Sequence, residues 1–141
     1  MADVEIKVKL DRDAYIPERA HDTDAGADIR ARSMFVLKPG HQVNVHTGVH
    51  IELPPNTVGM IKSKSGLYTK YGITATGVID EGYTGEIVVG LQNHGSRELV
   101  FQKGEKVAQL VVMPVVYPSF RISDSIDGGE RGDNGFGSTG A

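Results

Sequence analysis

The sequence predicts an all-β fold, arranged as a sandwich, jelly roll or barrel, with one short helix and a flexible, glycine-rich C-terminal tail. Three observations support this prediction: many short β-prone runs lie between turn signals, no window has the period of a long amphipathic helix, and glycine supplies 18 of the 141 residues. This length suits a single domain with one hydrophobic core. The sequence contains no cysteine, which excludes disulfides and thiolate metal sites.

The expected strands follow from alternation and from the turn residues between them. The clearest strand covers residues 4–10, where apolar and polar side chains alternate strictly. The best helical candidate is residues 66–71, which Gly72 ends. Further β-rich runs are separated by proline, glycine or asparagine, and they cover residues 34–37, 42–53, 57–61, 86–91, 99–102 and 107–116.

Charge and hydropathy restrict the expected partners. The formal net charge of −3 argues against long nucleic acid, because such binding draws mainly on clustered lysine and arginine. The longest apolar run, residues 110–117, is short and contains Pro114, so no membrane span is expected. The first residues carry acids where a signal peptide needs bases and then an apolar run, which favours a cytoplasmic location.

Two segments in the first half of the chain carry residues suited to chemistry. Residues 23–29 place two acidic side chains around Gly26, which by itself favours an Asx-type turn that caps a strand. Residues 62–67 place hydroxyl and ammonium groups beside Gly66, at the start of the expected helix. This second segment suits an anion site, because backbone N–H groups are free at a helix start, and it suits equally a solvated basic turn with a serine N-cap.

Two segments in the second half carry an acid and a glutamine. Residues 77–86 deliver Asp80 into a turn between glycines that also presents Tyr83. A carboxylate held there can act as general base on a water, although an ordinary β-hairpin explains the segment by itself. Residues 104–110 set Gln109 between apolar neighbours, where its amide requires either a structural hydrogen bond or a ligand contact.

The end of the chain predicts a flexible arm over residues 123–141, separate from a β core of residues 1–122. The apolar pattern vanishes there, and six of the last fourteen residues are glycine. The G-F-G-S-T-G sequence has the spacing of a dinucleotide-binding turn, but only Ala141 follows it, so a Rossmann unit is not expected. Phe136 is unusual for a purely solvating tail, because it is an aromatic side chain between glycines.

Three histidines in residues 41–50 are the remaining candidates for a metal site. They are His41, His46 and His50, and no carboxylate or cysteine completes a ligand set among them in the sequence. We expect surface or hydrogen-bonded histidines rather than a metal site of their own.

The order of the segments resembles the five ordered motifs of the homotrimeric dUTPase (dUTP diphosphatase) family. The motifs are the glycine turn with Asp28, S-K-S-G-L, G-V-I-D-E-G-Y-T-G-E, G-E-K-V-A-Q-L and R-G-D-N-G-F-G-S-T-G. They run from Thr23 to Gly140, and the third and fifth are the specific ones. The resemblance implies a distorted jelly-roll, β-clip-like barrel subunit that assembles as a homotrimer with active sites shared between subunits.

The resemblance also implies a reaction. It is the Mg²⁺-dependent hydrolysis of dUTP to dUMP and pyrophosphate by attack of water on the α-phosphorus, which supplies dUMP for thymidylate synthesis and keeps uracil out of DNA. Asp80 would be the catalytic base, and Asp28 would hold Mg²⁺ through its water ligands. The implied substrate-binding residues are Lys64, Ser65, Gly66, Gly77, Ile79, Tyr83, Gln109, Arg131, Phe136, Gly137, Ser138 and Thr139.

In this picture the arm is a lid that closes over bound substrate. Phe136 would stack over the uracil, Arg131 would contact the far phosphates, and Ser138 and Thr139 would close on the γ-phosphate. Tyr83 would pack against the deoxyribose and leave no room for a 2′-hydroxyl. Main-chain groups of residues 72–79 would pair with the uracil edge.

The sequence departs from the family pattern at four positions. Lys64 stands where the family usually has arginine, so a point charge replaces a bidentate phosphate contact. Gly82 and Thr84 stand where aspartate and arginine are common, and Asn134 replaces a common glycine. These departures affect individual contacts and not the resemblance as a whole, because the principal residues of the motifs are present.

Two other functions remain as alternatives. A dCTP deaminase shares this fold, but that family relies on a glutamate paired with arginine near the base, whereas the acid here is Asp80 and no arginine lies between Lys62 and Glu86. The other alternative is a β-rich regulatory protein that uses nucleotide binding as a switch. A regulatory protein partner would leave no recognisable signature in the sequence.

Overall fold

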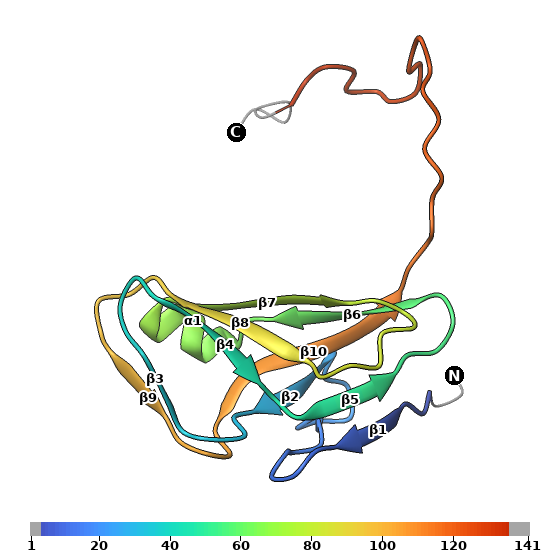
Figure 1. Ribbon diagram of the computed structural model, residues 1–141. Helices are drawn as coiled ribbons and strands as arrows, with labels where there is room; N and C mark the ends of the chain where they lie inside the picture. The colour runs from blue at the N-terminus through green and yellow to red at the C-terminus, as the bar shows by residue number, and fades with distance from the viewer. Residues whose placement is uncertain (1–3, 136–141) are drawn as a thin grey trace.

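The computed structural model describes residues 4–135 and shows a curled β-structure with one short helix (Figure 1). Its largest element is a six-stranded antiparallel sheet of order β2-β10-β6-β7-β8-β4. Two further antiparallel pairs, β1–β5 and β3–β9, form separate two-stranded sheets. The strands are β1 (Lys7–Leu10), β2 (Gly26–Arg30), β3 (Phe35–Leu37), β4 (Gln42–His46), β5 (Val49–Glu52), β6 (Thr57–Lys62), β7 (Ile73–Ile79), β8 (Val88–Asn93), β9 (Leu99–Phe101) and β10 (Lys106–Pro114), and the helix α1 is Ser65–Tyr71.

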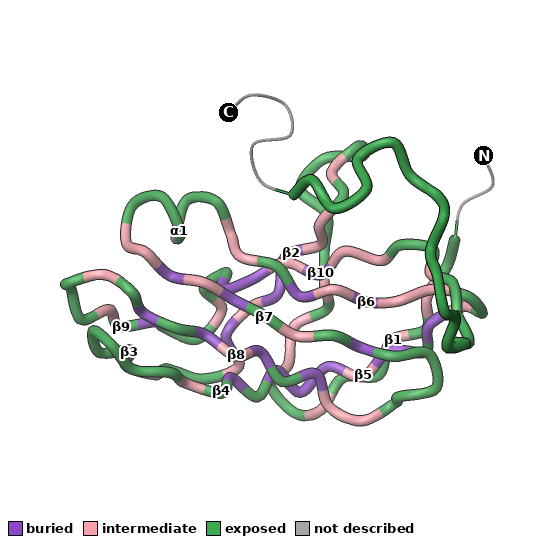
Figure 2. Tube along the Cα trace, turned by 90° about the horizontal axis from the view of Figure 1, so that it is seen from above, coloured by how far each residue is buried: buried purple, intermediate pink, exposed green. Residues whose placement is uncertain are grey.

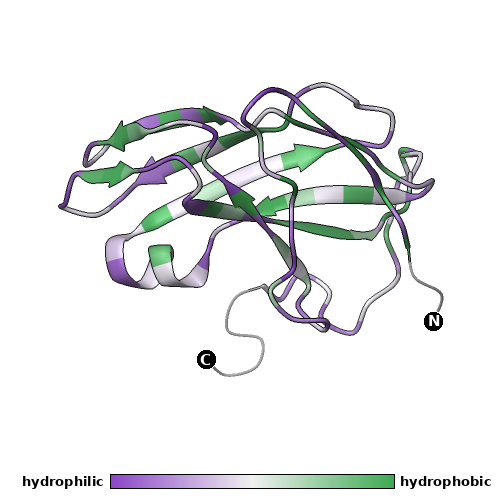
Figure 3. Ribbon diagram, turned by 90° about the horizontal axis from the view of Figure 1, so that it is seen from below, coloured by the Kyte–Doolittle hydropathy of each residue, from purple (hydrophilic) through white to green (hydrophobic). Residues whose placement is uncertain are grey.

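One hydrophobic core lies between these strands. Figure 2 shows that buried positions concentrate on the strands, whereas α1, the outer turns and the chain after β10 are largely exposed. Hydrophobic and hydrophilic positions alternate along several strands (Figure 3). The largest fully buried apolar side chains are Ile29, Leu37, Ile61, Ile73, Ile87 and Leu91.

Strand β8 illustrates why the sequence forms this sheet. Val89, Leu91 and Asn93 are buried, and the residues between them are less so. A period of two is that of a strand with one face on the core. The buried Asn93 amide donates to two backbone carbonyl oxygens at 3.1 and 2.7 Å, so its burial leaves no polar group unpaired.

The predicted all-β class with one short helix is confirmed, but several expected strand assignments were wrong. The run at residues 42–53 is two strands, because Gly48 between them has a φ of +70°. Strand β1 begins at Lys7 rather than at residue 4, because Lys7 pairs with Glu52, the last residue of β5, and Pro54 and Pro55 follow one residue later. Residues 26–30, expected as part of a turn, form β2 at the edge of the main sheet.

The chain leaves the sheet after Pro114 and extends away from the body (Figure 1). We call residues 115–122 the exit segment. Its Phe120 and Ile122 side chains are 93% and 97% exposed, and Val116 is 81% exposed. The predicted arm of residues 123–141 is described only as far as Gly135.

No helix among the described residues is both long and apolar enough to cross a membrane.

We expect Leu91→Ala to lower the free energy of unfolding by about 2–5 kcal/mol, because truncating a fully buried leucine loses its contacts and leaves a cavity. Urea titration followed by circular dichroism measures this change. Val100→Ala, at a side chain that is 49% exposed on β9, is the control and should cost less than about 1 kcal/mol. Equal losses in the two variants would contradict the assignment of Leu91 to the core.

Candidate active site

One group of predicted site residues meets where β2, β10 and β6 lie side by side. Gln109 in β10 is paired with Asp28 in β2 on one side and with Lys62 in β6 on the other. The Asp28 carboxylate accepts a hydrogen bond from the Lys64 ammonium, and its other oxygen lies 3.1 Å from Nζ of Lys106. Asp28 is therefore a buried anion held between two cations. No local sequence pattern signals that Lys106 belongs to this group.

The Asp28 side chain is only 7% exposed, and its surroundings act on it in two directions. Burial raises the pKa of Asp28, but the hydrogen bonds from Lys64 and Lys106 outweigh burial and leave that pKa below its ordinary value. The carboxylate is thus charged at neutral pH. In such a group the ammonium groups can bind an anionic ligand, and the carboxylate can bind a hydrated cation.

Gln109 is held by a structural hydrogen bond. Its Nε2 donates to the carbonyl oxygen of Ser63 at 2.9 Å. A Cβ atom at Gly26 would lie 2.0 Å from Oε1 of Gln109, so the glycine in β2 creates the space for this amide. Of the two partners that the sequence left open for Gln109, the structure shows the structural one.

Helix α1 places Ser65 and Gly66 at the surface next to this group. The N-cap residue is Lys64, no side chain caps the helix, and Ser65 is already its first residue. The serine N-cap that the sequence left open is therefore wrong. Gly72 ends the helix in a left-handed conformation with a φ of +71°, as the sequence predicts.

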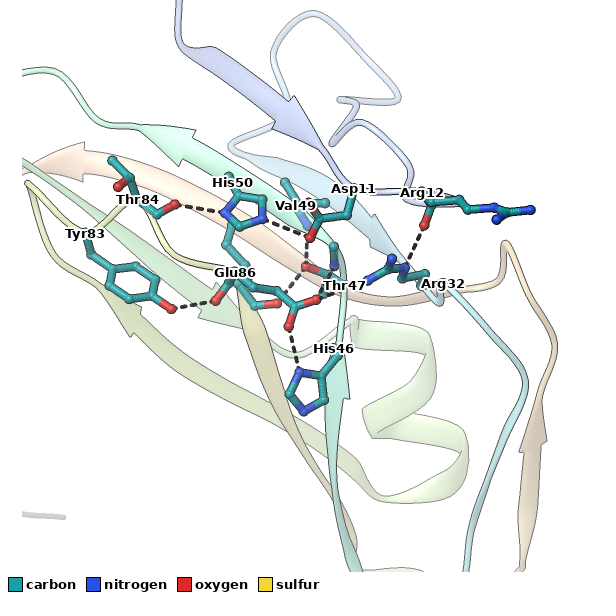
Figure 4. Close-up of polar contacts among 12 residues, drawn as sticks. Asp11, Arg12, Arg32, His46, Thr47, Val49, His50, Tyr83, Thr84 and Glu86 are labelled. Atoms are coloured by element: carbon teal, nitrogen blue, oxygen red, sulfur yellow. Dashed lines mark hydrogen bonds and ion pairs between the residues drawn. The ribbon is translucent and has the colours of Figure 1, made fainter.

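A second group forms at the end of β7, in the β7–β8 turn (residues 80–87). Asp80 is exposed there, and its carbonyl oxygen accepts a hydrogen bond of 3.1 Å from the Tyr83 backbone N–H. The Tyr83 hydroxyl donates to the carbonyl oxygen of Glu86 at 2.7 Å (Figure 4). A hollow of about 160 Å³ beside Tyr83 is lined by residues 77–79, 83 and 86–88. The turn thus places an aromatic ring against a small cavity and an exposed carboxylate one residue beyond its lining.

Two glycines make this turn possible. Gly82 has a φ of +90°, a conformation that side-chain-bearing residues rarely adopt. A Cβ atom at Gly85 would lie 2.5 Å from the Tyr83 hydroxyl oxygen, so the ring occupies the space of a missing side chain.

The β7–β8 turn is fastened to the rest of the fold by contacts that the sequence did not predict. The Glu86 carboxylate accepts a 2.8 Å bond from the Gly48 backbone N–H and lies 2.7 Å from Nδ1 of His46. The Thr84 carbonyl oxygen lies 2.8 Å from Nδ1 of His50 (Figure 4). These partners are 34–40 positions apart in the chain, and no local pattern signals them.

The two groups meet β6 at different points along its length. Ile79, which precedes Asp80, is paired with Gly59, whereas Gln109 is paired with Lys62. The three steps from Gly59 to Lys62 span about 10 Å at the rise of a β-strand. A single chain therefore brings Asp28, Lys64 and Gln109 together but keeps them apart from Asp80 and Tyr83.

The remaining predicted residues lie in the arm. Arg131 is exposed, and its guanidinium donates to the carbonyl oxygen of Asn134 at 3.1 Å. Phe136, Gly137, Ser138 and Thr139 lie outside the described residues.

Other features of the described chain do not form a metal site. Residues 4–135 contain no cluster of three histidine, aspartate or glutamate side chains that could hold a metal ion.

A larger hollow of about 520 Å³ is mainly apolar, lies among β1, β2, β5 and β10, and contains none of the predicted site residues.

Comparison with known proteins adds independent findings. A model of the dUTPase family matches residues 12–140. The deoxyuridine 5′-triphosphate nucleotidohydrolase of Clostridium tetani is 41% identical over 144 residues, which cover 99% of each sequence. The protein of the same name from Alkaliphilus metalliredigens is 44% identical over 139 residues, which cover 96% of each.

Solved structures show the same similarity. The Staphylococcus bacteriophage 80alpha dUTPase with dUpNHpp has a TM-score of 0.86 and 30% identity, covering 97% of this chain and 99% of that one. A mutant dUTPase from phage phi11 of Staphylococcus aureus, in which a structural Mg(II) ion is coordinated, has a TM-score of 0.81 and 27% identity, covering 89% and 100%. These similarities confirm the predicted jelly-roll-like architecture.

We expect Asp28→Asn to cost about 1–2 kcal/mol of folding free energy at pH 7, because it leaves two lysines without their buried counter-charge, although both can still reach water. The pKa of Asp28 is lowered in the folded state, so its stabilisation is complete above the unfolded pKa of about 3.9 and disappears as pH falls through the lower folded value. Urea titrations at several pH values measure the difference.

Asp24→Asn is the control for this prediction. Asp24 is 40% exposed and pairs with an exposed histidine, so its removal should cost less than about 0.5 kcal/mol at any pH. A penalty for Asp28→Asn that stays constant down to pH 2 would contradict the ion-pair explanation.

Proposed function

This chain belongs to the dUTPase family, and we propose that its Asp80 carboxylate activates the water that hydrolyses dUTP. The protein is a dUTP diphosphatase, which converts dUTP to dUMP and pyrophosphate with Mg²⁺. The observation that carries the assignment of residues is the β7–β8 turn, in which Tyr83 lines a hollow of about 160 Å³ and the exposed Asp80 directly follows Ile79 of its lining. The other roles follow from the placement of the motifs.

Asp80 is suited to the role of base because its side chain is exposed where a water can reach it. The carboxylate accepts a proton from that water as its oxygen attacks the α-phosphorus in line with the departing pyrophosphate. A new bond forms from the water oxygen to phosphorus, and the bond from the α-phosphorus to the bridging oxygen breaks. The turn hydrogen bond from the Tyr83 N–H holds the backbone of Asp80 in place.

Tyr83 and strand β7 are suited to select the nucleoside. The Tyr83 ring, fixed by its bond to the Glu86 carbonyl oxygen, would pack against the deoxyribose and exclude a 2′-hydroxyl by its bulk. Gly77 and Ile79 line the adjacent hollow and offer backbone groups to the uracil edge. A narrow hollow of this kind excludes the methyl group of thymine.

Lys64, Ser65, Gly66 and Gln109 are suited to bind the triphosphate. Ser65 and Gly66 are exposed at the start of α1, and Gln109 lies in β10, paired with Asp28 in β2 and with Lys62 in β6. Lys64 is bonded to Asp28 in this structure and meets a phosphate only if its flexible stem turns from the carboxylate. Because lysine offers a point charge, this contact lacks the bidentate geometry of arginine.

The described residues fit an Mg²⁺ ion that arrives with the triphosphate. Mg²⁺ keeps several waters and binds commonly through one or two carboxylates and substrate phosphates. Asp28 offers one buried carboxylate, which suits contact through water ligands better than a protein cage. When bound, the ion supplies neutralisation of the charge on the phosphate oxygens.

We infer that the active enzyme is a homotrimer with sites shared between subunits. The two groups of site residues meet β6 three residues apart in one chain, a separation that supports a site completed by a second copy. The exit segment exposes the apolar side chains of Val116, Phe120 and Ile122. These residues are separated by even numbers of positions, which is the spacing of side chains on one face of a strand. An apolar hollow of about 520 Å³ among β1, β2, β5 and β10 offers further apolar contact surface.

The arm is the proposed lid of this shared site. Arg131 carries an exposed guanidinium that suits the distal phosphates, and Phe136, Gly137, Ser138 and Thr139 would cover the base and the γ-phosphate. A segment that becomes ordered on binding excludes water from the reacting groups. Together with a core of residues 1–122, this arm would make up the proposed two-part organisation of the chain.

We expect the purified protein to release pyrophosphate from dUTP in the presence of Mg²⁺, and far more slowly from dCTP, dTTP, dATP, dGTP or UTP. Asp80→Asn should retain nucleotide binding and lower kcat by on the order of 10²–10⁴-fold, because it removes the base and preserves the shape. Pyrophosphate release and calorimetric binding of dUpNHpp measure the two effects. Glu81→Gln, at the neighbouring carboxylate, is the control and should retain kcat within about threefold.

Two results would contradict this assignment. Release of ammonia from dCTP without pyrophosphate from dUTP would identify a deaminase. Unchanged turnover in Asp80→Asn would remove Asp80 from the role of base.

We expect deletion of residues 128–141 to leave the assembly intact and to lower kcat/KM for dUTP by on the order of 100-fold, because the strands lie upstream and the lid is lost. Analytical ultracentrifugation and pyrophosphate release measure the two properties. A chain that lacks only Ala141 is the control. Loss of the oligomer in the deleted chain would show that the arm is part of the subunit interface instead.

A further inference from the structure

His50 links the β7–β8 turn to the opposite side of the fold. It lies in β5, its Nδ1 is 2.8 Å from the Thr84 carbonyl oxygen, and its Nε2 is 2.9 Å from a carboxylate oxygen of Asp11 (Figure 4). Asp11 follows β1, and its backbone N–H donates to the Gly48 carbonyl oxygen at 2.8 Å. The Asp11–His50–Thr84 bridge therefore joins β1 and β5 to the turn that carries Asp80.

The partners of the His50 ring define its protonation state. A backbone carbonyl oxygen can only accept a hydrogen bond, and so can an ionised carboxylate. The ring satisfies both partners only when both of its nitrogens carry hydrogen, which is the imidazolium form. The neutral ring has one N–H and must give up one of the two contacts.

The charges around the ring favour the same form. The hydrogen bonds to Asp11 and Thr84 raise the pKa of His50, partly opposed by burial and by the cation of Lys9, its cross-strand neighbour. The hydrogen bond from His50 lowers the pKa of Asp11, so that carboxylate is ionised near neutral pH. Figure 4 shows further ionisable side chains around the bridge, which are Arg12, Arg32, His46, Tyr83 and Glu86.

We propose that His50 is a positioning residue for the proposed reaction: its protonated ring clamps Thr84 to Asp11 and thereby holds Asp80 and Tyr83 in place. This inference rests on the function proposed for that turn. The clamp is present when the ring is charged and opens when the ring loses its proton. Thr84 directly follows Tyr83, so its release loosens both the base and the wall that faces the sugar.

The pH dependence follows from the sign of the shift. The pKa of His50 is raised above its ordinary value of about 6.5, so the clamp is complete below that value and is lost as pH rises through the raised pKa. We expect kcat/KM for dUTP to fall on the alkaline side with this midpoint, by about tenfold for a small displacement of the reacting groups. Discrimination of dUTP from UTP should fall in the same pH range.

The test compares wild type with His50→Gln and Asp11→Asn between about pH 6 and pH 9. NMR of the His50 Hε1 proton and of the backbone amides of residues 83–85 gives the midpoint of the clamp without relying on activity. We expect His50→Gln to abolish the alkaline step, and Asp11→Asn to shift the NMR and kinetic midpoints together to lower pH. His41→Gln is the matched control, since His41 also contacts a backbone carbonyl oxygen, that of Pro39 at 3.0 Å, far along the chain from the turn.

Three outcomes are decisive against the clamp. The first is an alkaline fall in kcat/KM that persists in His50→Gln. The second is a kinetic midpoint that does not change in Asp11→Asn while the NMR midpoint moves. The third is that the amide chemical shifts of residues 83–85 do not change as His50 titrates. If His50→Gln does not fold, Asp11→Asn retains the histidine and carries the comparison. Absence of dUTP hydrolysis at every pH in wild type would overturn the proposed function instead, and the amide titration would still decide the clamp.

Discussion

The pairing of β6 between β10 and β7 is the constraint from which the arrangement of the site follows. On one side β6 aligns Lys62 with Gln109, and on the other it aligns Gly59 with Ile79. The hydrogen-bond ladder fixes these registers, because a shift by one residue would turn every side chain to the opposite face. The Asp28–Lys64–Gln109 group and the turn that carries Asp80 are therefore held at a separation that the strand register sets.

Charge compensation is the second organising element. A carboxylate buried in β2 requires cations, and Lys64 and Lys106 provide them from two other parts of the chain. These lysines are 29% and 42% exposed, so their ammonium groups remain accessible to an anion from solvent. The protein thus satisfies its buried charge with cationic groups that remain partly open to solvent.

The sequence predicts the parts of this structure that depend on local pattern. Alternation of apolar and polar residues identifies most strands, and the glycines of residues 77–86 identify the turn that contains Asp80 and Tyr83. Contacts that depend on strand register are beyond local pattern. Asp28 and Lys64 are 36 positions apart, and Asp11 and His50 are 39 apart. Such pairs become neighbours only once β2, β10 and β6, or β1 and β5, are aligned.

The close approach of Gly85 to Tyr83 couples the two positions in any redesign of the β7–β8 turn. The hydroxyl oxygen of Tyr83 lies 2.5 Å from where a Cβ atom at Gly85 would be. A smaller residue in place of Tyr83 frees that space, so a side chain at position 85 then becomes admissible. The two positions should consequently be varied together in a library, because a screen of either one alone samples mostly clashes or voids.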